Sequence, residues 1–226
     1  MNKMGRSGFS NYCDKDMPGK SDTYFFMKAR GQAFFCGTAY PTEESRSDSP
    51  CRKALEVGGG SFLRRPSLRD EAVNTIADFI NQGIYAFQEP GKPFFCSLAA
   101  LYEYRGKART IVSGDAHICH FKDGKLIGQS EEQEEPLFGE RIRREQETEP
   151  EFELSGGSHA FLLVSGLKSN EYLKIIEMLQ AEQDTVSYEE DVWPDAIIEK
   201  FEGKACSVAA FVMPERKGKV FQVFGI

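Results

Sequence analysis

The stretch VSGDAHICHFKDGKL, from Val112 to Leu126, decides the predicted fold. Residues 116–121 and 125–127 are predicted to be two short sequential strands. Between them, Lys122-Asp123-Gly124 is typical of a hairpin turn, because Asp and Gly tolerate the backbone conformations that tight turns need. The stretch therefore predicts an antiparallel β-hairpin.

Within the first of these strands, His117 and Cys119 are two residues apart. Alternate residues of a strand point to the same face, so the two side chains are predicted to lie on one face. Both are zinc-ligand types, but two ligands do not complete a tetrahedral site, and no second pair is evident. A metal role and an ordinary strand position both stay open for this pair.

Outward from this hairpin, much of the chain is predicted to form further strands. They lie at residues 24–27, 32–36, 94–104, 108–112, 159–165, 205–213 and 219–224. Helices are predicted at residues 67–87, 169–181 and 192–201. Strand runs with few helices between them do not alternate as βαβ units. The sequence therefore predicts the α+β class, with antiparallel sheets covered by helices.

The predicted helix at 67–87 has the clearest signals. Ser67 is a residue type that caps helices, and Asp70 and Glu71 follow in the first turn, where the helix dipole favours negative charge. A shorter helix is expected from Cys51, and the glycines at 58–60 are expected to weaken or end it.

Composition excludes several classes of function. The 226 residues contain 28 Lys and Arg against 35 Asp and Glu, a net charge of −7. This argues against a general nucleic-acid binder and against docking on an anionic membrane. No apolar run is long enough to span a membrane. The polar N-terminal stretch has no apolar core of a secretory signal, so a cytoplasmic location is expected.

The predicted organisation is one domain over residues 20–226, preceded by a flexible leader over 1–19. Residues 128–153 are rich in Glu and are expected to form a solvated acidic excursion. The chain has six cysteines and no CxxC pair, which favours buried thiols over disulfides or a zinc finger. They are Cys13, Cys36, Cys51, Cys96, Cys119 and Cys206.

Three blocks, in order, resemble the metal-dependent protein phosphatases, the type 2C Ser/Thr phosphatases. Residues 112–126 resemble the family's Gly-Asp hairpin, residues 152–167 resemble its strand ending in Ser-Asp-Gly-Leu, and residues 203–212 resemble the strand with its Asp-Asn pair. The resemblance covers residues 20–226. It implies a four-layer α-β-β-α sandwich with two central antiparallel sheets. It also implies two Mg²⁺ or Mn²⁺ ions that activate a water to attack a phosphate ester.

Most of the carboxylates that this chemistry requires are missing. The aligned positions hold non-acidic residues, namely Cys36, Gly37, Ser165 and Ala205. Two acids remain as metal candidates by the resemblance. Asp22 stands near the end of the first segment, and Asp115 stands in the Gly-Asp hairpin, where some members hold an additional metal. Alternatively, Asp22 is an ordinary strand-start residue, and Asp115 accepts backbone N–H bonds in its turn. The same alignment leaves Lys20 as the candidate phosphate-binding cation.

A pair of hard dications needs several anionic oxygen ligands, and neutral Ser and Cys side chains are poor substitutes. The expected function is therefore a pseudophosphatase with no cofactor, catalytically weak or inactive. Its role would be to bind a phosphoprotein or a regulatory protein. The alternative is an active Mg²⁺- or Mn²⁺-dependent phosphatase with displaced ligands, drawn from Glu43, Glu44 or Asp48. A hydrolase with a Ser or Cys nucleophile is a third hypothesis, although no Gly-x-Ser-x-Gly motif is present.

Overall fold

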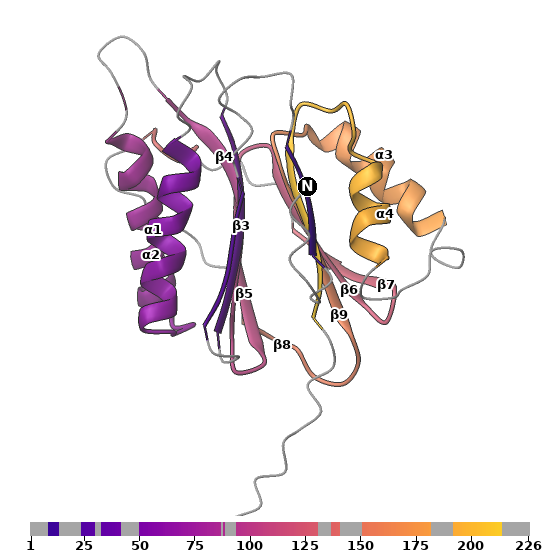
Figure 1. The fold of residues 1–226 in the computed structure, drawn as a ribbon, viewed down its shortest axis with the longest axis horizontal. Helices are drawn as coiled ribbons and strands as arrows, with labels where there is room; N and C mark the ends of the chain where they lie inside the picture. Colours follow the sequence, from indigo (N-terminus) through magenta and orange to yellow (C-terminus); the bar gives the residue numbers. More distant parts are fainter. Residues whose placement is uncertain are drawn as a thin grey trace, which may run out of the picture.

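The computed structural model describes residues 9–13, 24–29, 33–41, 50–86, 88, 94–130, 137–140, 151–181 and 192–213. Two sheets face each other at the centre, with helices α1 and α2 outside one and α3 and α4 outside the other (Figure 1). Every strand pairing within the two sheets is antiparallel. The predicted α+β sandwich, with helix, sheet, sheet and helix layers, is thus confirmed.

Each sheet has five strands among the described residues. One runs in the order β2-β3-β4-β5-β8, with the bounds Tyr24–Ala29, Ala33–Pro41, Cys96–Tyr104, Lys107–Ser113 and Phe152–Glu153. The other runs in the order β1-β10-β9-β6-β7, with the bounds Phe9–Cys13, Ser207–Met213, His159–Ser165, Ala116–Lys122 and Lys125–Gln129. All the predicted strands that fall on described residues are present. The strand predicted at 219–224 lies outside them.

The hairpin turn predicted at 122–124 has the backbone expected of it, and the turn between β4 and β5 has the same form. Asp123 and Gly124 between β6 and β7 have φ values of 48° and 82°. Arg105 and Gly106 between β4 and β5 have values of 57° and 82°. Consecutive positive φ angles give the turn a twist that matches the twist of the flanking strands.

Two expectations about the irregular segments are wrong in part. Residues 9–13, expected in a flexible leader, form β1 and pair with β10. This pairing satisfies backbone groups of β10 that would otherwise lie on an open edge. Phe138, expected in the solvated excursion 128–153, is fully buried and exchanges two backbone hydrogen bonds with Cys96. Residues 152–153 of that excursion form β8 beside β5.

Helix α1 (Pro50–Arg64) continues through the three glycines that were expected to weaken or end it. A Cβ added to Gly58 would lie 2.3 Å from Ile80, and one added to Gly59 would lie 2.4 Å from Phe35. The missing side chains let α1 pack closely against both α2 (Asp70–Tyr85) and the sheet. This close packing outweighs the low helix propensity of glycine, so the expectation was wrong.

Helix α2 begins without the predicted Ser67 cap. The capping position is Arg69, whose side chain makes no capping hydrogen bond. Ser67 Oγ instead accepts a long hydrogen bond of 3.4 Å from the Arg69 N–H. The cap prediction is wrong because the helix starts two residues later than the capping pattern required.

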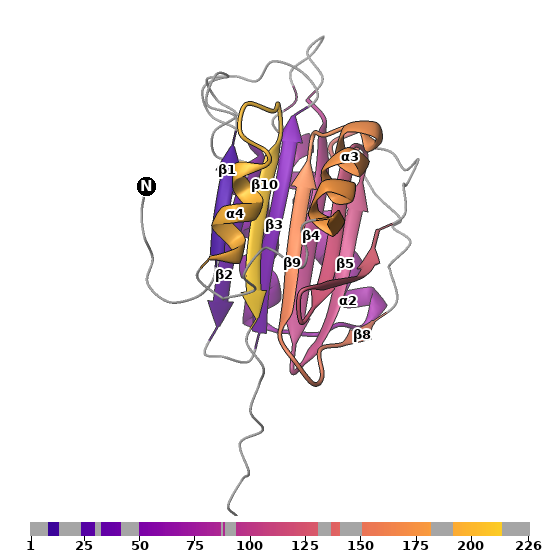
Figure 2. The same cartoon turned by 90° about the vertical axis from the view of Figure 1, so that its right-hand side faces the viewer.

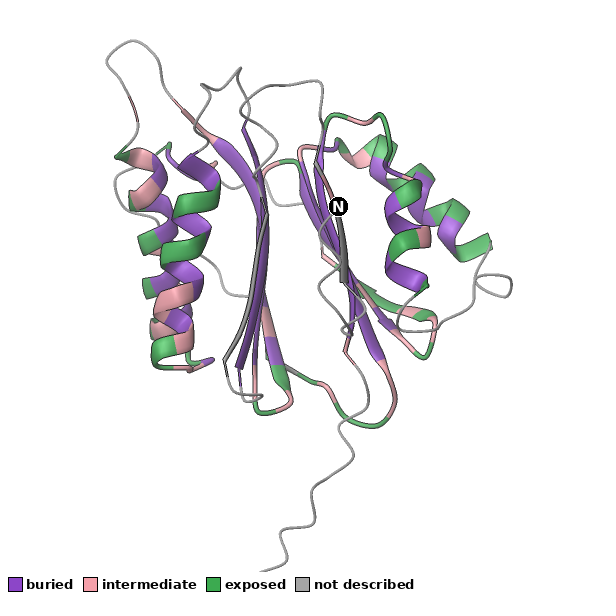
Figure 3. Ribbon diagram, in the orientation of Figure 1, coloured by how far each residue is buried: buried purple, intermediate pink, exposed green. Residues whose placement is uncertain are grey.

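Three apolar layers hold the elements together. One lies between α1, α2 and the first sheet, and one between the two sheets. The third lies between the second sheet and the helices α3 (Ser169–Ala181) and α4 (Trp193–Glu199). Figure 2 shows α3 and α4 across the outer face of that sheet, and Figure 3 shows that the helices bury the sides that face the sheets. No helix in the described part of the chain is long and apolar enough to cross a membrane.

Candidate functional site

The end of the sandwich at which β3 and β9 finish collects small polar side chains between the sheets. It is the upper end in Figure 2. Phe34 and Cys36 of β3, and Phe161 and Leu163 of β9, belong to the apolar layer between the sheets. Because strand residues alternate in direction, Thr38 and Ser165 continue the same two faces beyond this apolar layer. Both side chains are fully buried.

Thr38 and Ser165 join the two sheets through hydrogen bonds. Their hydroxyl oxygens lie 2.9 Å apart. The Ser165 hydroxyl also lies 3.1 Å from the carbonyl oxygen of Thr38, to which it donates. Thr38 is then the donor in the contact between the hydroxyls. The two neutral groups satisfy each other, as buried polar groups require.

Tyr40 and Asp115 lie close to the end of β9. Gly166 follows Ser165 with a φ of 91°. A Cβ at Gly166 would lie 2.3 Å from ring atoms of Tyr40, so this ring packs directly against the backbone of Gly166. The Gly166 N–H donates to the carbonyl oxygen of Asp115 at 2.7 Å. The structure therefore brings Asp115 near Ser165 through the backbone, while the Asp115 residue itself is exposed.

The other aligned positions do not converge on this point. Cys36 lies between the sheets, and burial raises the pKa of its thiol, which keeps it neutral. Gly37 faces the opposite way, since a Cβ there would lie 2.8 Å from Leu55 in α1. Ala205 is exposed before β10, and it is Ser207 that pairs in register with Ser165. Asp22, Lys20 and the acids at 43, 44 and 48 lie outside the described residues.

These donors do not fit a centre for two hard dications. The described part of the chain contains no group of three or more His, Cys, Asp or Glu side chains that could hold a metal ion. Around Thr38 and Ser165 the donors are hydroxyls and a protonated thiol, whereas Mg²⁺ and Mn²⁺ select carboxylates. No reaction step through a metal follows from these residues.

Thr38 is the member of the site that the sequence reasoning missed. The resemblance assigns metal-binding acids, so it gives no role to the neutral Thr38, which directly follows Gly37. The spacing of Phe34, Cys36 and Thr38 is a signal that could have found it, because residues two apart share one strand face.

The pair of His117 and Cys119 lies on one face of β6, as predicted, and both contact Tyr172 of α3. The ring of His117 stacks on Tyr172 at 4.0 Å between centroids, and its Nε2 lies 3.1 Å from the Leu167 carbonyl oxygen. Cys119 Sγ lies 2.6 Å from the Tyr172 hydroxyl, and burial raises the pKa of this thiol to about 12. These contacts use the two side chains to attach α3 to the sheet, which favours the ordinary strand position over a metal role.

Comparison with known proteins identifies the fold. No protein-family model matches the chain, and no curated protein matches it. A serine/threonine phosphatase of S. agalactiae is 11% identical, with a TM-score of 0.65 over 92% of this chain and 100% of its own. PppA of Pseudomonas aeruginosa is 13% identical, with a TM-score of 0.61 over 90% and 95%. The catalytic domain of the phosphatase PstP, solved with two manganese ions, is 9% identical, with a TM-score of 0.57 over 92% and 97%.

At these identities the likeness concerns the fold and not the chemistry. It extends over nine-tenths of this chain and nearly the whole of each neighbour. The chain therefore has the α-β-β-α sandwich fold of the metal-dependent Ser/Thr phosphatases, the type 2C phosphatases.

Proposed function

We propose that this protein is a pseudophosphatase, which uses the phosphatase fold for binding or regulation and has little or no metal-dependent activity. The observation that carries the proposal is the hydrogen-bonded pair of Thr38 and Ser165. The resemblance assigns a metal-binding carboxylate to position 165, and the side chain there is a neutral hydroxyl bonded to its neighbour across the sheets.

Electrostatics supports this reading. Two dications in one site repel each other and lose their hydration shells, so they require several anionic ligands. A neutral hydroxyl that is held in buried hydrogen bonds carries no negative charge to offset that repulsion. Tyr40 also packs over the end of β9, which reduces the space at this end.

The proposed partner is a phosphoprotein or a regulatory protein. PppA is described as a key regulatory component of the T6SS in its own organism, which shows that one protein with this fold has a regulatory role. Since function depends on the site and not on the fold, this support is by analogy.

The test is hydrolysis of p-nitrophenyl phosphate by the full chain with saturating Mn²⁺, with and without EDTA. Thermal unfolding first checks that the protein is folded. The folded protein is then expected to show no EDTA-sensitive turnover. Calorimetric titration with Mn²⁺ alone is expected to show no tight binding.

Turnover that EDTA abolishes would overturn the proposal in favour of an active phosphatase with displaced ligands. In that case Asp22→Asn and Asp115→Asn would identify the ligands, because each would weaken both Mn²⁺ binding and turnover. Gly60→Ala, a change in α1 with no neighbour within 4 Å of the added Cβ, serves as the control that should leave both unchanged.

A further inference from the structure

The loop between α1 and α2 presents a serine among arginines. It runs from Arg65 to Arg69, between the last residue of α1 and the first residue of α2. Arg64, Arg65 and Arg69 are exposed, and Ser67 is partly buried. The hydroxyl of Ser67 does not cap α2 and accepts one long bond of 3.4 Å. This serine is therefore not needed to form the helix.

The order of residues around Ser67 matches a pattern that some protein kinases recognise in their substrates. Arg64 and Arg65 lie three and two positions before the serine, and the apolar Leu68 follows it. Basophilic Ser/Thr protein kinases select this arrangement, because acidic side chains in their substrate groove pair with the guanidinium groups. In a chain with a net charge of −7, three arginines within residues 64–69 form a local exception to the overall charge.

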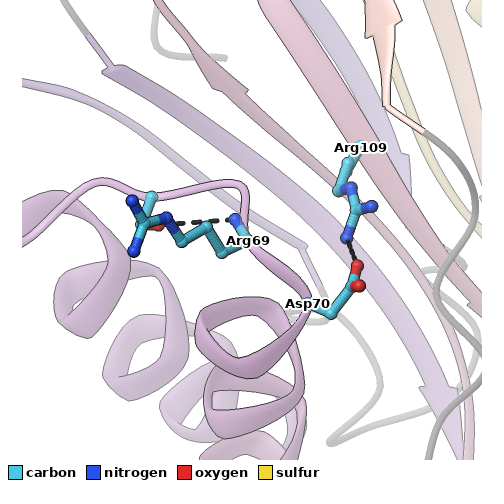
Figure 4. Close-up of polar contacts among 4 residues, drawn as sticks. Arg69, Asp70 and Arg109 are labelled. Atoms are coloured by element: carbon cyan, nitrogen blue, oxygen red, sulfur yellow. Dashed lines mark hydrogen bonds and ion pairs between the residues drawn. The ribbon is translucent and has the colours of Figure 1, made fainter.

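The surroundings of Ser67 suit an added phosphate. Asp70, the nearest acid along the chain, forms an ion pair with Arg109 of β5 (Figure 4). Arg109 thereby offsets part of its negative charge. Figure 4 also shows the Arg69 side chain turned away from this ion pair and back along the loop. Arg69 is thus placed to form charge-assisted hydrogen bonds with a phosphate on Ser67.

We propose that Ser67 is a phosphorylation site for a basophilic Ser/Thr protein kinase. The Ser67 hydroxyl oxygen attacks the γ-phosphorus of a nucleoside triphosphate bound to the kinase. The new Oγ–P bond replaces the bond from that phosphorus to the diphosphate, which leaves as the nucleoside diphosphate. The hydroxyl proton passes to a carboxylate of the kinase. The inference is independent of whether the sandwich has phosphatase activity.

Recognition by the kinase requires the loop to open locally. Leu68 is 7% exposed and packs in the layer between the helices and the sheet. The loop joins two helix ends, and helix ends open at a lower free-energy cost than the core of a fold. The last turn of α1 follows three glycines, which lowers its intrinsic helix stability.

The test treats the folded full chain with the catalytic subunit of cAMP-dependent protein kinase and Mg-ATP, and locates phosphate by mass spectrometry of peptides. One phosphoryl group on Ser67 is expected. Ser67→Ala should remove it, and the double variant Arg64→Gln/Arg65→Gln should slow it by about tenfold or more, since each charged hydrogen bond lost costs about that factor. The matched control Arg52→Gln/Lys53→Gln removes the same charge at the opposite end of α1 and should leave the rate unchanged.

Absence of phosphate on Ser67 of the folded chain would overturn the inference, even if urea-unfolded chain is modified. Equal rates for Arg64→Gln/Arg65→Gln and the parent protein would overturn it too, because the arginines would then not be recognised. Thermal unfolding of each variant checks that it is folded. Phosphorylation of Ser67 does not predict the outcome of the phosphatase assay, so the two proposals are tested separately.

Discussion

The hydroxyl of Ser165 in β9 lies 2.9 Å from the hydroxyl of Thr38 in β3, a residue 127 positions earlier in the chain. The two strands belong to different sheets. This contact therefore ties the sheets together at the end where the candidate site lies, and it does so with neutral groups.

Ser165→Ala should destabilise the protein more than Thr38→Val. Ser165→Ala removes both the contact between the hydroxyls and the bond to the Thr38 carbonyl. Thr38→Val removes only the contact between the hydroxyls. Expected losses in the free energy of unfolding are about 2 kcal/mol for Ser165→Ala and about 1 kcal/mol for Thr38→Val. Urea unfolding of both variants and of the double variant measures the coupling energy between Thr38 and Ser165. If the two losses in the free energy of unfolding were strictly additive, a direct bond between the side chains would be contradicted.

The three consecutive glycines of α1 should respond differently to alanine. Gly58→Ala and Gly59→Ala place a Cβ within 2.4 Å of Ile80 and Phe35, so each should lower the free energy of unfolding by about 1–3 kcal/mol. Gly60→Ala meets nothing within 4 Å and should raise stability by up to about 1 kcal/mol through helix propensity. Thermal unfolding of the three variants ranks their stabilities. A destabilising Gly60→Ala would show that the helix ends before residue 60.

His120 should make stability depend on pH. Its Nε2 lies 2.9 Å from Nδ1 of His159, and its ring stacks on Phe161. Burial lowers the pKa of His120 to about 4, helped by the nearby His159 and Lys122. The unfolded chain, with a His pKa near 6.5, then binds more protons than the folded chain between about pH 6.5 and pH 4. Stability should therefore fall as pH falls through that window.

The contribution of His120 to this loss is on the order of 2 kcal/mol after allowance for its partial exposure. His120→Phe keeps a ring against Phe161 and removes the titrating group. Urea unfolding at pH 7 and pH 5 should show a smaller loss for this variant than for the parent protein. An equal loss in both proteins would mean that other groups cause the pH dependence.

Five of the six cysteines should be unreactive in the folded protein. These five are fully buried thiols, namely Cys36, Cys51, Cys96, Cys119 and Cys206. Alkylation requires the thiolate, and burial raises the pKa of both Cys36 and Cys119. In a Cys13→Ser background, iodoacetamide at neutral pH should label no site until urea is added. Rapid labelling of a single thiol in the native state would support the hypothesis of a Cys nucleophile.

Local patterns predicted the elements whose signals lie within a few residues of sequence. The hairpin turn at 122–124 and the strand His159–Ser165 were predicted from turn residues and an apolar run. The predictions failed where a distant segment decided the outcome. Helix α1 persists because Ile80 and Phe35 occupy the space beside its glycines, and β1 forms because β10 has an edge to pair with.

The same division holds for the candidate site. The sequence alone shows that residues 36, 37, 165 and 205 are not acidic. It therefore already shows that carboxylates are missing from the positions that the resemblance assigns. Which neutral groups meet was decided by the tertiary structure, because only the packing of one sheet on the other brings Thr38 to Ser165 and sets Tyr40 against Gly166. Strand periodicity determines the face on which a side chain lies, whereas its partner across the sheets depends on how the two faces are stacked.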